Sequence, residues 1–464
     1  VVVVDPRRTR TAALADVHLR PRPGTDVALA LGMAHWIVAQ GAHDPSFLDS
    51  HTRGWDSFRA AVDEWNVERA AEACGVAPAE IRRLADIYVA ASPAVIRCGW
   101  GIERNRNGVD AVRAVLALPA IAGKFGVRGG GFTMSMSSAH AVDKRRLQRP
   151  DLRVQPARTV NMTQLGRALT ELDEPRIHAL FVYNANPVAS TPDQNRILAG
   201  LARDDLFTGV PEQVLTDTAL WADVVLPATT IFEQEELHKS YGHTYLQSSA
   251  PIVPAAGSAV DNPTLFGRLA QRMGLGSPEL FATETLAIDA IGAERVEKLR
   301  RTGVVDVGGD AAIVPFVNTW PRTPDRRIDL APAELGPLRF RPAPADAPPL
   351  ALLTPASMRL VNSIFGEFNL PEAVLCMHPD DARPRGIEKG AWVRVANELG
   401  VVEVRVQLDD SVLPGVVTLP KGAWRAATRN GSTSTALICD QVGDVGGGAC
   451  FNDARVEVTR IYDE

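Results

Sequence analysis

The chain lacks several features that would assign it to common protein classes. No apolar run approaches the ~18 residues that a membrane-crossing helix needs. The five cysteines form no CxxC pair, so the sequence encodes neither a zinc knuckle nor a closely spaced iron–sulfur loop. It has no P-loop, and the segment GWGIER does not match GxGxxG. Acidic residues outnumber basic ones, 55 to 49, which argues against nucleic-acid binding through bulk charge.

The composition is that of an ordinary globular protein, with 45% hydrophobic and 22% charged residues. Its 464 residues predict about three domains at ~150 residues each. The cysteines are scattered, odd in number and mostly inside apolar stretches, which is typical of a reducing compartment. We therefore expect a cytoplasmic protein with no membrane span and no nucleic-acid partner.

The first part of the chain alternates apolar strands with helices. The helix expected in GTDVALALGMAHWIVAQG has Thr25 as its N-cap, and Pro78 stands where the first turn of another helix tolerates proline. The strand PAVIRCGWG leads into a helix expected near residues 109–122. This βαβα order predicts an α/β fold with a parallel sheet covered by helices.

The pattern changes after a proline-rich stretch. Residues 331–350 hold six prolines, which predicts an extended linker. Beyond it the apolar residues alternate with period two, and WVRVANELGVVEVRVQL predicts a hairpin that turns near residues 397–400. We predict α/β domains over residues 1–128 and 129–330, a linker over 331–349 and a β-barrel over 350–464.

Four stretches end a predicted strand with polar residues or glycine: VVVVDPR, IRCGWGIERN, LFVYNANP and VVLPATT. Ligands of open parallel sheets bind outside the carboxyl ends of the strands. Together the stretches offer carboxylate, amide, guanidinium and glycine backbone, which suit a nucleotide. Taken singly, turn or surface roles are the more common explanation for these residues, which are Asp5, Arg7, Gly99, Gly101, Asn184 and Asn186.

Histidines and acidic runs give weaker candidates. His238 and His243 are five residues apart, a spacing that does not place both on one helical face as metal ligands. The acidic run around Glu235 is typical of a solvated face. His140, beyond the glycine cluster GVRGGG, is a weak candidate for a catalytic group on the substrate side.

The order of these motifs resembles a known family. DPRRT, GWGIERNRNG, GGG, FVYNANPVAST and LTDTALWADVVLPATT follow one another as in the molybdopterin oxidoreductases, the dimethyl sulfoxide reductase family. LLTPASMRLVNSIFGE, HPDDARPRGIEKGAWVRVANELG, LPGVVTLP and ACFNDARVEV resemble that family's molybdopterin dinucleotide-binding barrel. The resemblance is collinear and runs nearly end to end. It implies that residues 1–128 and 129–330 lie on the two dinucleotide sides and that the C-terminal barrel is of the double-psi type.

The resemblance also implies a cofactor and a reaction. The cofactor is molybdenum or tungsten held by two molybdopterin guanine dinucleotides. The reaction is oxygen-atom or hydride transfer on a small-molecule substrate, with electrons exchanged with a partner subunit or redox protein. The residues implied to bind the cofactor are Asp5, Arg7, Gly24, Asp26, Gly99, Gly101, Arg104, Asn184, Asn186, Thr216, Thr218, Thr354, Ser357, Asn362 and Asn452.

The resemblance implies a longer protein as well. In the family, a region before the VVVVDPR strand usually carries an iron–sulfur motif and the residue that ligates the metal. Neither occurs in this sequence, so we expect the cluster and the metal ligand upstream, no metal ligand within these residues, and no activity from this fragment alone.

Alternatives stay open at this point. Formate dehydrogenase-like and oxyanion or sulfur-compound reductase-like activities both fit. A molybdenum-free electron-transfer scaffold, like the large iron–sulfur subunit of respiratory NADH dehydrogenase, is the alternative from another class. The many polar residues at strand ends favour a bound cofactor over that scaffold. A nicotinamide or flavin dehydrogenase would need a glycine fingerprint that is absent.

Overall fold

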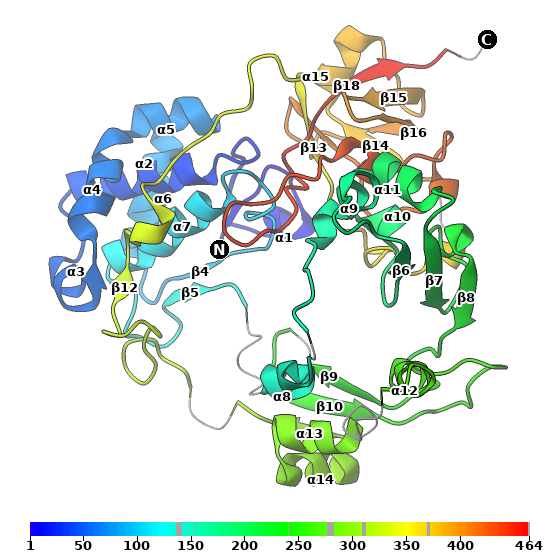
Figure 1. The fold of residues 1–464 in the computed structure, drawn as a ribbon. Coiled ribbons are helices and arrows are strands. Elements are labelled where there is room, and N and C mark those ends of the chain that lie inside the picture. Colours follow the sequence, from blue (N-terminus) through cyan, green and yellow to red (C-terminus); the bar gives the residue numbers. More distant parts are fainter. Residues whose placement is uncertain are drawn as a thin grey trace.

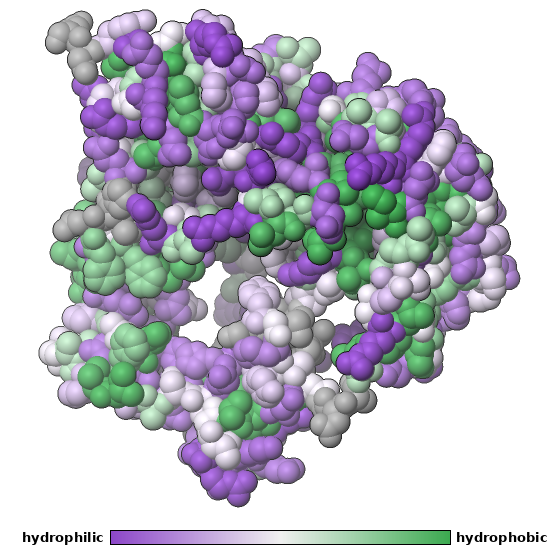
Figure 2. All heavy atoms as spheres, turned by 180° about the vertical axis from the view of Figure 1, so that it is seen from behind, coloured by the Kyte–Doolittle hydropathy of each residue, from purple (hydrophilic) through white to green (hydrophobic). Residues whose placement is uncertain are grey.

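The structure is a computed structural model that describes residues 1–462 apart from 136–141, 154, 240, 276–282, 309–311 and 369–371. Its elements surround a central space, with a helical domain on one side, the C-terminal barrel and a three-stranded sheet on the other, and a small lobe below (Figure 1). The view from behind shows that openings remain between the atoms there (Figure 2). No helix within the described residues is long and apolar enough to cross a membrane.

The first domain is built on short parallel strand pairs. They are β1 (Val2–Val4) with β2 (Val17–Leu19), β4 (Val95–Arg97) with β5 (Gly131–Thr133), and β3 (Thr52–Arg53) with β12 (Ile328–Asp329). The helices are α1 (Arg10–Ala13), α2 (Asp26–Ala39), α3 (Pro45–His51), α4 (Trp55–Glu64), α5 (Val67–Cys74), α6 (Pro78–Ala90) and α7 (Gly108–Ile121).

Helix α2 is the centre of this domain's core. It packs against α5, α6 and α7, and apolar residues are buried on nearly every side of it. The predicted helices are confirmed, including Pro78 in the first turn of α6. Thr25 does occupy the N-cap position of α2, but its hydroxyl donates to the Arg22 carbonyl oxygen at 2.7 Å and makes no capping bond.

A second α/β unit follows. Strands β6 (Ala179–Phe181), β7 (Phe207–Glu212) and β8 (Val224–Pro227) form a parallel sheet in chain order, beside helices α9 (Leu165–Glu171), α10 (Pro187–Ser190) and α11 (Gln194–Leu201). The lower lobe holds the antiparallel strands β9 (Glu236–Lys239), β10 (Tyr245–Ser249) and β11 (Val304–Asp306), with α8 (Lys144–Gln148), α12 (Asn262–Arg272), α13 (Thr283–Ile291) and α14 (Ala293–Thr302).

The C-terminal strands close into a barrel of order β13-β17-β14-β16-β15-β18. They are β13 (Leu350–Leu353), β14 (Val374–Met377), β15 (Trp392–Ala396), β16 (Val401–Leu408), β17 (Val416–Thr418) and β18 (Arg455–Arg460). Alternate valines such as Val393 and Val395 fill the interior, as period-two patterning requires. The predicted hairpin is confirmed, with the Asn397 N–H donating to the Gly400 carbonyl oxygen at 3.1 Å. The predicted α/β fold with parallel sheets and a C-terminal barrel is also confirmed.

The proline-rich segment lies against the first domain. Leu338 and Phe340 pack on its apolar core, and the Phe340 ring meets Trp65 edge-on at a centroid distance of 5.6 Å. The segment is extended but docked, and β12 just before it pairs with β3. The domain boundaries given above stay predictions.

Candidate cofactor-binding site

The barrel meets the first domain at Asn452, just before β18. The Asn452 N–H donates to the Arg104 carbonyl oxygen at 2.9 Å, and its side-chain amide donates to the Gly101 carbonyl oxygen at 3.5 Å. The Thr354 N–H donates to the Asn452 side-chain oxygen at 3.4 Å, and the Thr354 hydroxyl donates to the Phe451 carbonyl oxygen at 3.3 Å. Four predicted residues from three motifs, Gly101, Arg104, Thr354 and Asn452, therefore lie together.

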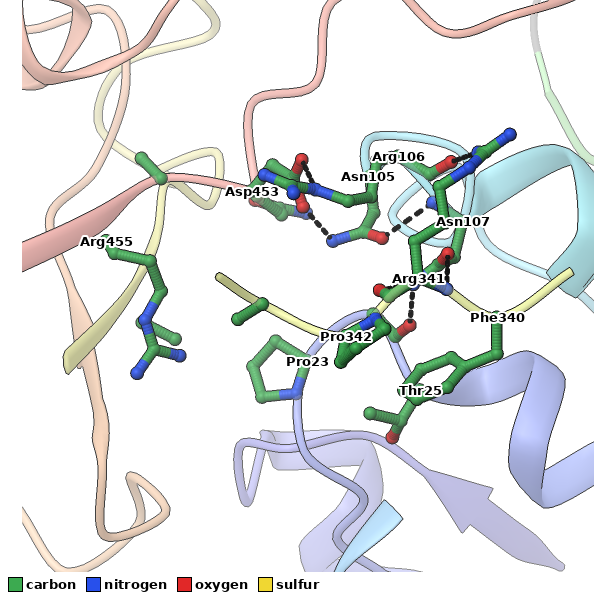
Figure 3. Close-up of a pocket in the computed structure, with 15 residues that line it drawn as sticks. Pro23, Thr25, Asn105, Arg106, Asn107, Phe340, Arg341, Pro342, Asp453 and Arg455 are labelled. Atoms are coloured by element: carbon green, nitrogen blue, oxygen red, sulfur yellow. Dashed lines mark hydrogen bonds and ion pairs between the residues drawn. The ribbon is translucent and has the colours of Figure 1, made fainter. Parts of the chain in front are cut away.

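A small pocket lies beside this contact (Figure 3). The buried Asp453 carboxylate accepts from Asn105 Nδ2 at 2.7 Å and from Arg106 Nε at 2.5 Å. Asn107 Nδ2 donates to the carbonyl oxygen of Gly24 at 3.0 Å. Gly24 thus faces the same pocket, and the Asn105 side chain covers it.

Gly24 offers a test of this packing. Its φ is +76°, and an added Cβ would lie 2.4 Å from Asn105 Nδ2. We expect Gly24→Ala to lower the free energy of unfolding by about 2 kcal/mol or more, from left-handed strain plus displacement of Asn105. Gly41→Ala is the control, because φ is +64° there and nothing lies within 4 Å of the new Cβ. It should cost only about 1 kcal/mol. Equal losses in urea denaturation would contradict the packing argument.

Acidic groups gather where β1 ends and α2 begins. The Asp5 carboxylate accepts from the Arg7 N–H at 2.8 Å. Burial raises the pKa of Asp5, while this hydrogen bond partly offsets the rise. Burial also raises the pKa of Asp26 to about 6, with a smaller contribution from the Asp5 carboxylate. Burial raises the pKa of Cys98, at the end of β4, and the Asp26 carboxylate adds a smaller rise, so the predicted Asp5 and Asp26 lie near the ends of two strand pairs.

The raised pKa of Asp26 makes stability depend on pH. The folded protein holds this proton up to about pH 6, whereas the ordinary pKa is 3.8. Stability is therefore lost as the pH rises from 3.8 through 6. We expect Asp26→Asn to be more stable than the wild type by about 2 kcal/mol at pH 7.5 and to have no advantage near pH 4.

Denaturant midpoints at the two pH values measure this effect. Asp56, the exposed acidic residue in the first turn of α4, is the matched control. Asp56→Asn should give no gain at either pH. A gain for Asp26→Asn that does not change with pH would contradict the assignment.

A second group of predicted residues lies at the carboxyl ends of β6 and β7. Asn186 is only 4% exposed, and its Oδ1 accepts from the Thr218 hydroxyl at 2.7 Å and the Thr218 N–H at 3.2 Å. The Thr216 hydroxyl accepts from the Ala219 N–H at 3.3 Å. Asn186 Nδ2 is buried and has no hydrogen-bond partner in the part of the chain that the structure describes. It is a donor without an acceptor.

Asn184 lies apart from this group. It is exposed, with a left-handed φ of 52°, and its Oδ1 accepts from Asn262 Nδ2 at the start of α12, at 3.0 Å.

Ser357 makes a local turn, its hydroxyl accepting from the Arg359 N–H at 3.1 Å. Gly99 has nothing within 4 Å of an added Cβ. His140 lies outside the described residues.

One barrel loop, residues 421–425, links both groups. The Arg425 N–H donates to the buried Asp217 carboxylate at 2.7 Å. At the other end, the Lys421 N–H donates to the Pro355 carbonyl oxygen at 3.2 Å. Between them, a Cβ on Gly422 would lie 1.3 Å from the carbonyl oxygen of Asn362, so only glycine permits this approach. The predicted Asn362 therefore packs against the loop.

Sequence reasoning missed Lys421. Its ammonium lies 5.5 Å from the centre of the Phe451 ring, and the Arg104 guanidinium lies 5.5 Å from the same centre. Lys421 follows the barrel strand β17, as LPKG shows. The rule that strand ends hold ligands could have found it, had it been applied to the barrel as well as to the α/β part.

Comparison with known proteins decides the family. The molybdopterin oxidoreductase family model matches residues 1–272, and the molybdopterin dinucleotide-binding domain model matches residues 362–455. The chain belongs to the molybdopterin oxidoreductase family. The probable oxidoreductase YoaE of Bacillus subtilis is 33% identical to it over 99% of this chain and 70% of its own length.

Two further relatives have named activities. A dimethyl sulfoxide/trimethylamine N-oxide reductase of Rhodobacter capsulatus is 27% identical over 91% of this chain and 61% of its own length. A formate dehydrogenase alpha subunit of Methanocaldococcus jannaschii is 26% identical over 94% of this chain and 69% of its own length. The chain thus spans only part of each relative.

A solved structure shows the same fold. The acetylene hydratase of Pelobacter acetylenicus matches 99% of this chain and 74% of its own, with a TM-score of 0.82 and 22% identity. The family matches identify the chain as a molybdopterin-dependent oxidoreductase of the dimethyl sulfoxide reductase family. They give no support to the molybdenum-free electron-transfer scaffold.

Proposed function

We propose that this chain holds two molybdopterin guanine dinucleotides of a molybdenum or tungsten oxidoreductase. The observation that carries the proposal is the buried, unpaired Nδ2 of Asn186 at the carboxyl ends of a parallel sheet. When bound, the cofactor supplies a metal centre that exchanges oxygen atoms, hydride and electrons with a small molecule. The protein's part is to hold, orient and shield that cofactor.

The residues around Asn186 fit a guanine. The Thr218 N–H requires an acceptor, which fixes the amide with Oδ1 toward Thr218 and leaves Nδ2 free to donate. A buried donor without a partner costs about 1–3 kcal/mol, and an acceptor on a ligand would remove that cost. Guanine presents O6 and N7 as acceptors, whereas adenine presents an amino group in place of O6. We propose that Asn186 Nδ2 donates to O6, which would make the site prefer guanine over adenine.

The other predicted residues suit a second dinucleotide and the pterins. The Asp5 and Asp26 carboxylates can accept from the N–H groups of guanine or from ribose hydroxyls, and Arg7 can neutralise a phosphate. Thr354 and Asn452 bring the barrel against the first domain at Gly101. We propose that the remaining predicted residues, Gly24, Gly99, Arg104, Asn184, Thr216, Thr218, Ser357 and Asn362, line the same cofactor path.

For the reaction we propose oxygen-atom or hydride transfer on a small molecule, with electrons exchanged with a redox partner protein. Reduction of an oxyanion or sulfur compound and oxidation of formate are the two candidates. The named relatives support both, because they include a dimethyl sulfoxide/trimethylamine N-oxide reductase and a formate dehydrogenase subunit.

Nucleotide titration tests the guanine assignment without loaded enzyme. Calorimetry on residues 1–464 should show tighter binding of GMP than of AMP. Asn186→Asp keeps the acceptor for Thr218 and loses the donor, so it should weaken GMP binding about tenfold or more. The exposed Asn195 gives the control, and Asn195→Asp should bind GMP like the wild type. Equal affinity for GMP and AMP, or unchanged GMP binding by Asn186→Asp, would overturn the assignment.

A further inference from the structure

Two cations from distant parts of the chain meet at one aromatic ring. Arg104 comes from the loop after β4 and Lys421 from the loop after β17, and each charged group lies 5.5 Å from the centre of Phe451. All three residues are half-buried. In the part of the chain that the structure describes, neither cationic group makes an ion pair or a hydrogen bond.

This arrangement is electrostatically unfavourable by itself. Burial lowers the pKa of Lys421, and the charge of Arg104 lowers it further, so the two cations are close enough to repel. Burial raises the pKa of the neighbouring Glu103, and the charge of Arg104 partly offsets that rise. Within the described residues no ion pair joins the two. Burial and a neighbouring like charge both disfavour the charged form of a cation, and a bound anion would offset that cost.

The surroundings place this pair at the candidate cofactor site. Asn452 follows Phe451 and bonds to the Arg104 backbone, and Thr354 bonds to the Phe451 carbonyl oxygen. The residue after Lys421, Gly422, touches Asn362. The two cations are therefore held by the segments that carry the predicted cofactor residues of the first domain and the barrel.

We propose that Arg104 and Lys421 form a two-cation site for an oxyanion between the first domain and the barrel. The guanidinium can give two parallel hydrogen bonds, and the ammonium adds a point charge from the barrel side. The oxyanion has two sources, the diphosphate of the dinucleotide or a small anionic substrate. If the anion is the substrate, this inference rests on the proposed function. It then restricts the substrate to oxyanions.

Competitive acylation tests this site on residues 1–464. Mass spectrometry after brief acetylation, at constant ionic strength in chloride, reports the reactivity of each lysine. Inorganic pyrophosphate should slow acetylation of Lys421 about fivefold or more, because a bound anion favours the ammonium and lowers the fraction of neutral amine, which is the form that reacts. The exposed Lys389 is the internal control and should react at the same rate throughout. Arg104→Gln should remove most of the protection and leaves the lysine in place as the readout.

The choice of anion separates the two sources. Protection by pyrophosphate at concentrations about tenfold below those of formate, nitrate or sulfate would assign the site to the cofactor diphosphate. Comparable protection by the small anions would assign it to the substrate. No protection by any of them, or equal protection of Lys389, would overturn the site.

A stability measurement separates an anion site from a purely structural role. If Lys421 awaits an anion, Lys421→Met should unfold no earlier than the wild type without added anions, because one of two repelling charges is gone. A marked loss of stability would show that Lys421 serves packing alone and would overturn the proposal. The preference for GMP at Asn186 is measured independently of these outcomes. The two-cation site and the proposed function can therefore be contradicted separately.

Discussion

Replacing Asp453 with alanine is expected to lower the free energy of unfolding by roughly 2–4 kcal/mol. The carboxylate is only 7% exposed and accepts from both Asn105 and Arg106, which come from the first domain. Its removal leaves the Arg106 charge unpaired and the Asn105 amide without its acceptor. Because Asn452 directly precedes Asp453, the contact of the barrel with Gly101 should loosen as well.

Asp444→Ala is the matched control. Asp444 also pairs with an arginine close to this interface, Arg341 of the docked proline-rich segment, at 2.6 Å, but its side chain is 57% exposed. An exposed pair of this kind contributes about 0–1 kcal/mol. Guanidinium denaturation of the two variants measures the difference, and similar small losses for both would show that Asp453 does not hold the domains together.

Asp453 also shows where sequence reasoning ends. Its partners lie 347 and 348 residues earlier in the chain, and no local pattern connects ACFND with GIERNRN. Motif order predicted that Asn452 and Arg104 belong to one site, but the contact between them depends on how the barrel packs. The same holds for β12, whose two residues pair with β3 from the start of the chain.

Local sequence patterns were sufficient to predict elements whose structure depends mainly on their own residues. Alternating valines predicted the hairpin of β15 and β16, and the proline in the first turn predicted the start of α6. The strand-end rule selected Asn186, whereas Thr216 and Thr218 came from the family resemblance, and the chain order of β6, β7 and β8 brings the three together. Neither could predict that Asn184, two residues earlier, would bond to Asn262 instead.

The sequence shows which residues can ionise but not how burial shifts their pKa. Asp26 and Lys421 are each ordinary in composition, yet burial raises the pKa of one and lowers that of the other. The family resemblance assigned Asp26 itself to the cofactor, and Lys421 lies beside Arg104, which it also assigned. Ionisable groups with shifted pKa values cluster at functional sites, where a bound ligand can offset the cost of burying their charge. Stability at neutral pH is lower as a result.

The second large effect is expected at Gln194, which is 0% exposed. Its Nε2 donates to the Val188 carbonyl oxygen at 2.9 Å, and its Oε1 accepts from the Thr433 N–H of the barrel at 2.9 Å. Gln194→Ala leaves both backbone groups buried and unpaired and opens a cavity. We expect a loss of roughly 3–5 kcal/mol in the free energy of unfolding.

The neighbouring Asn195 isolates the effect of burial. Its side chain also donates to a barrel carbonyl oxygen, that of Leu399, at 2.9 Å, but the residue is exposed and water can replace the bond. Asn195→Ala should therefore cost only about 0.5–1 kcal/mol. Val188 follows Asn186 by two residues, so Gln194→Ala should also weaken GMP binding, whereas Asn195→Ala should not. Equal denaturation midpoints for the two variants would show that the second α/β unit does not depend on this bridge to the barrel.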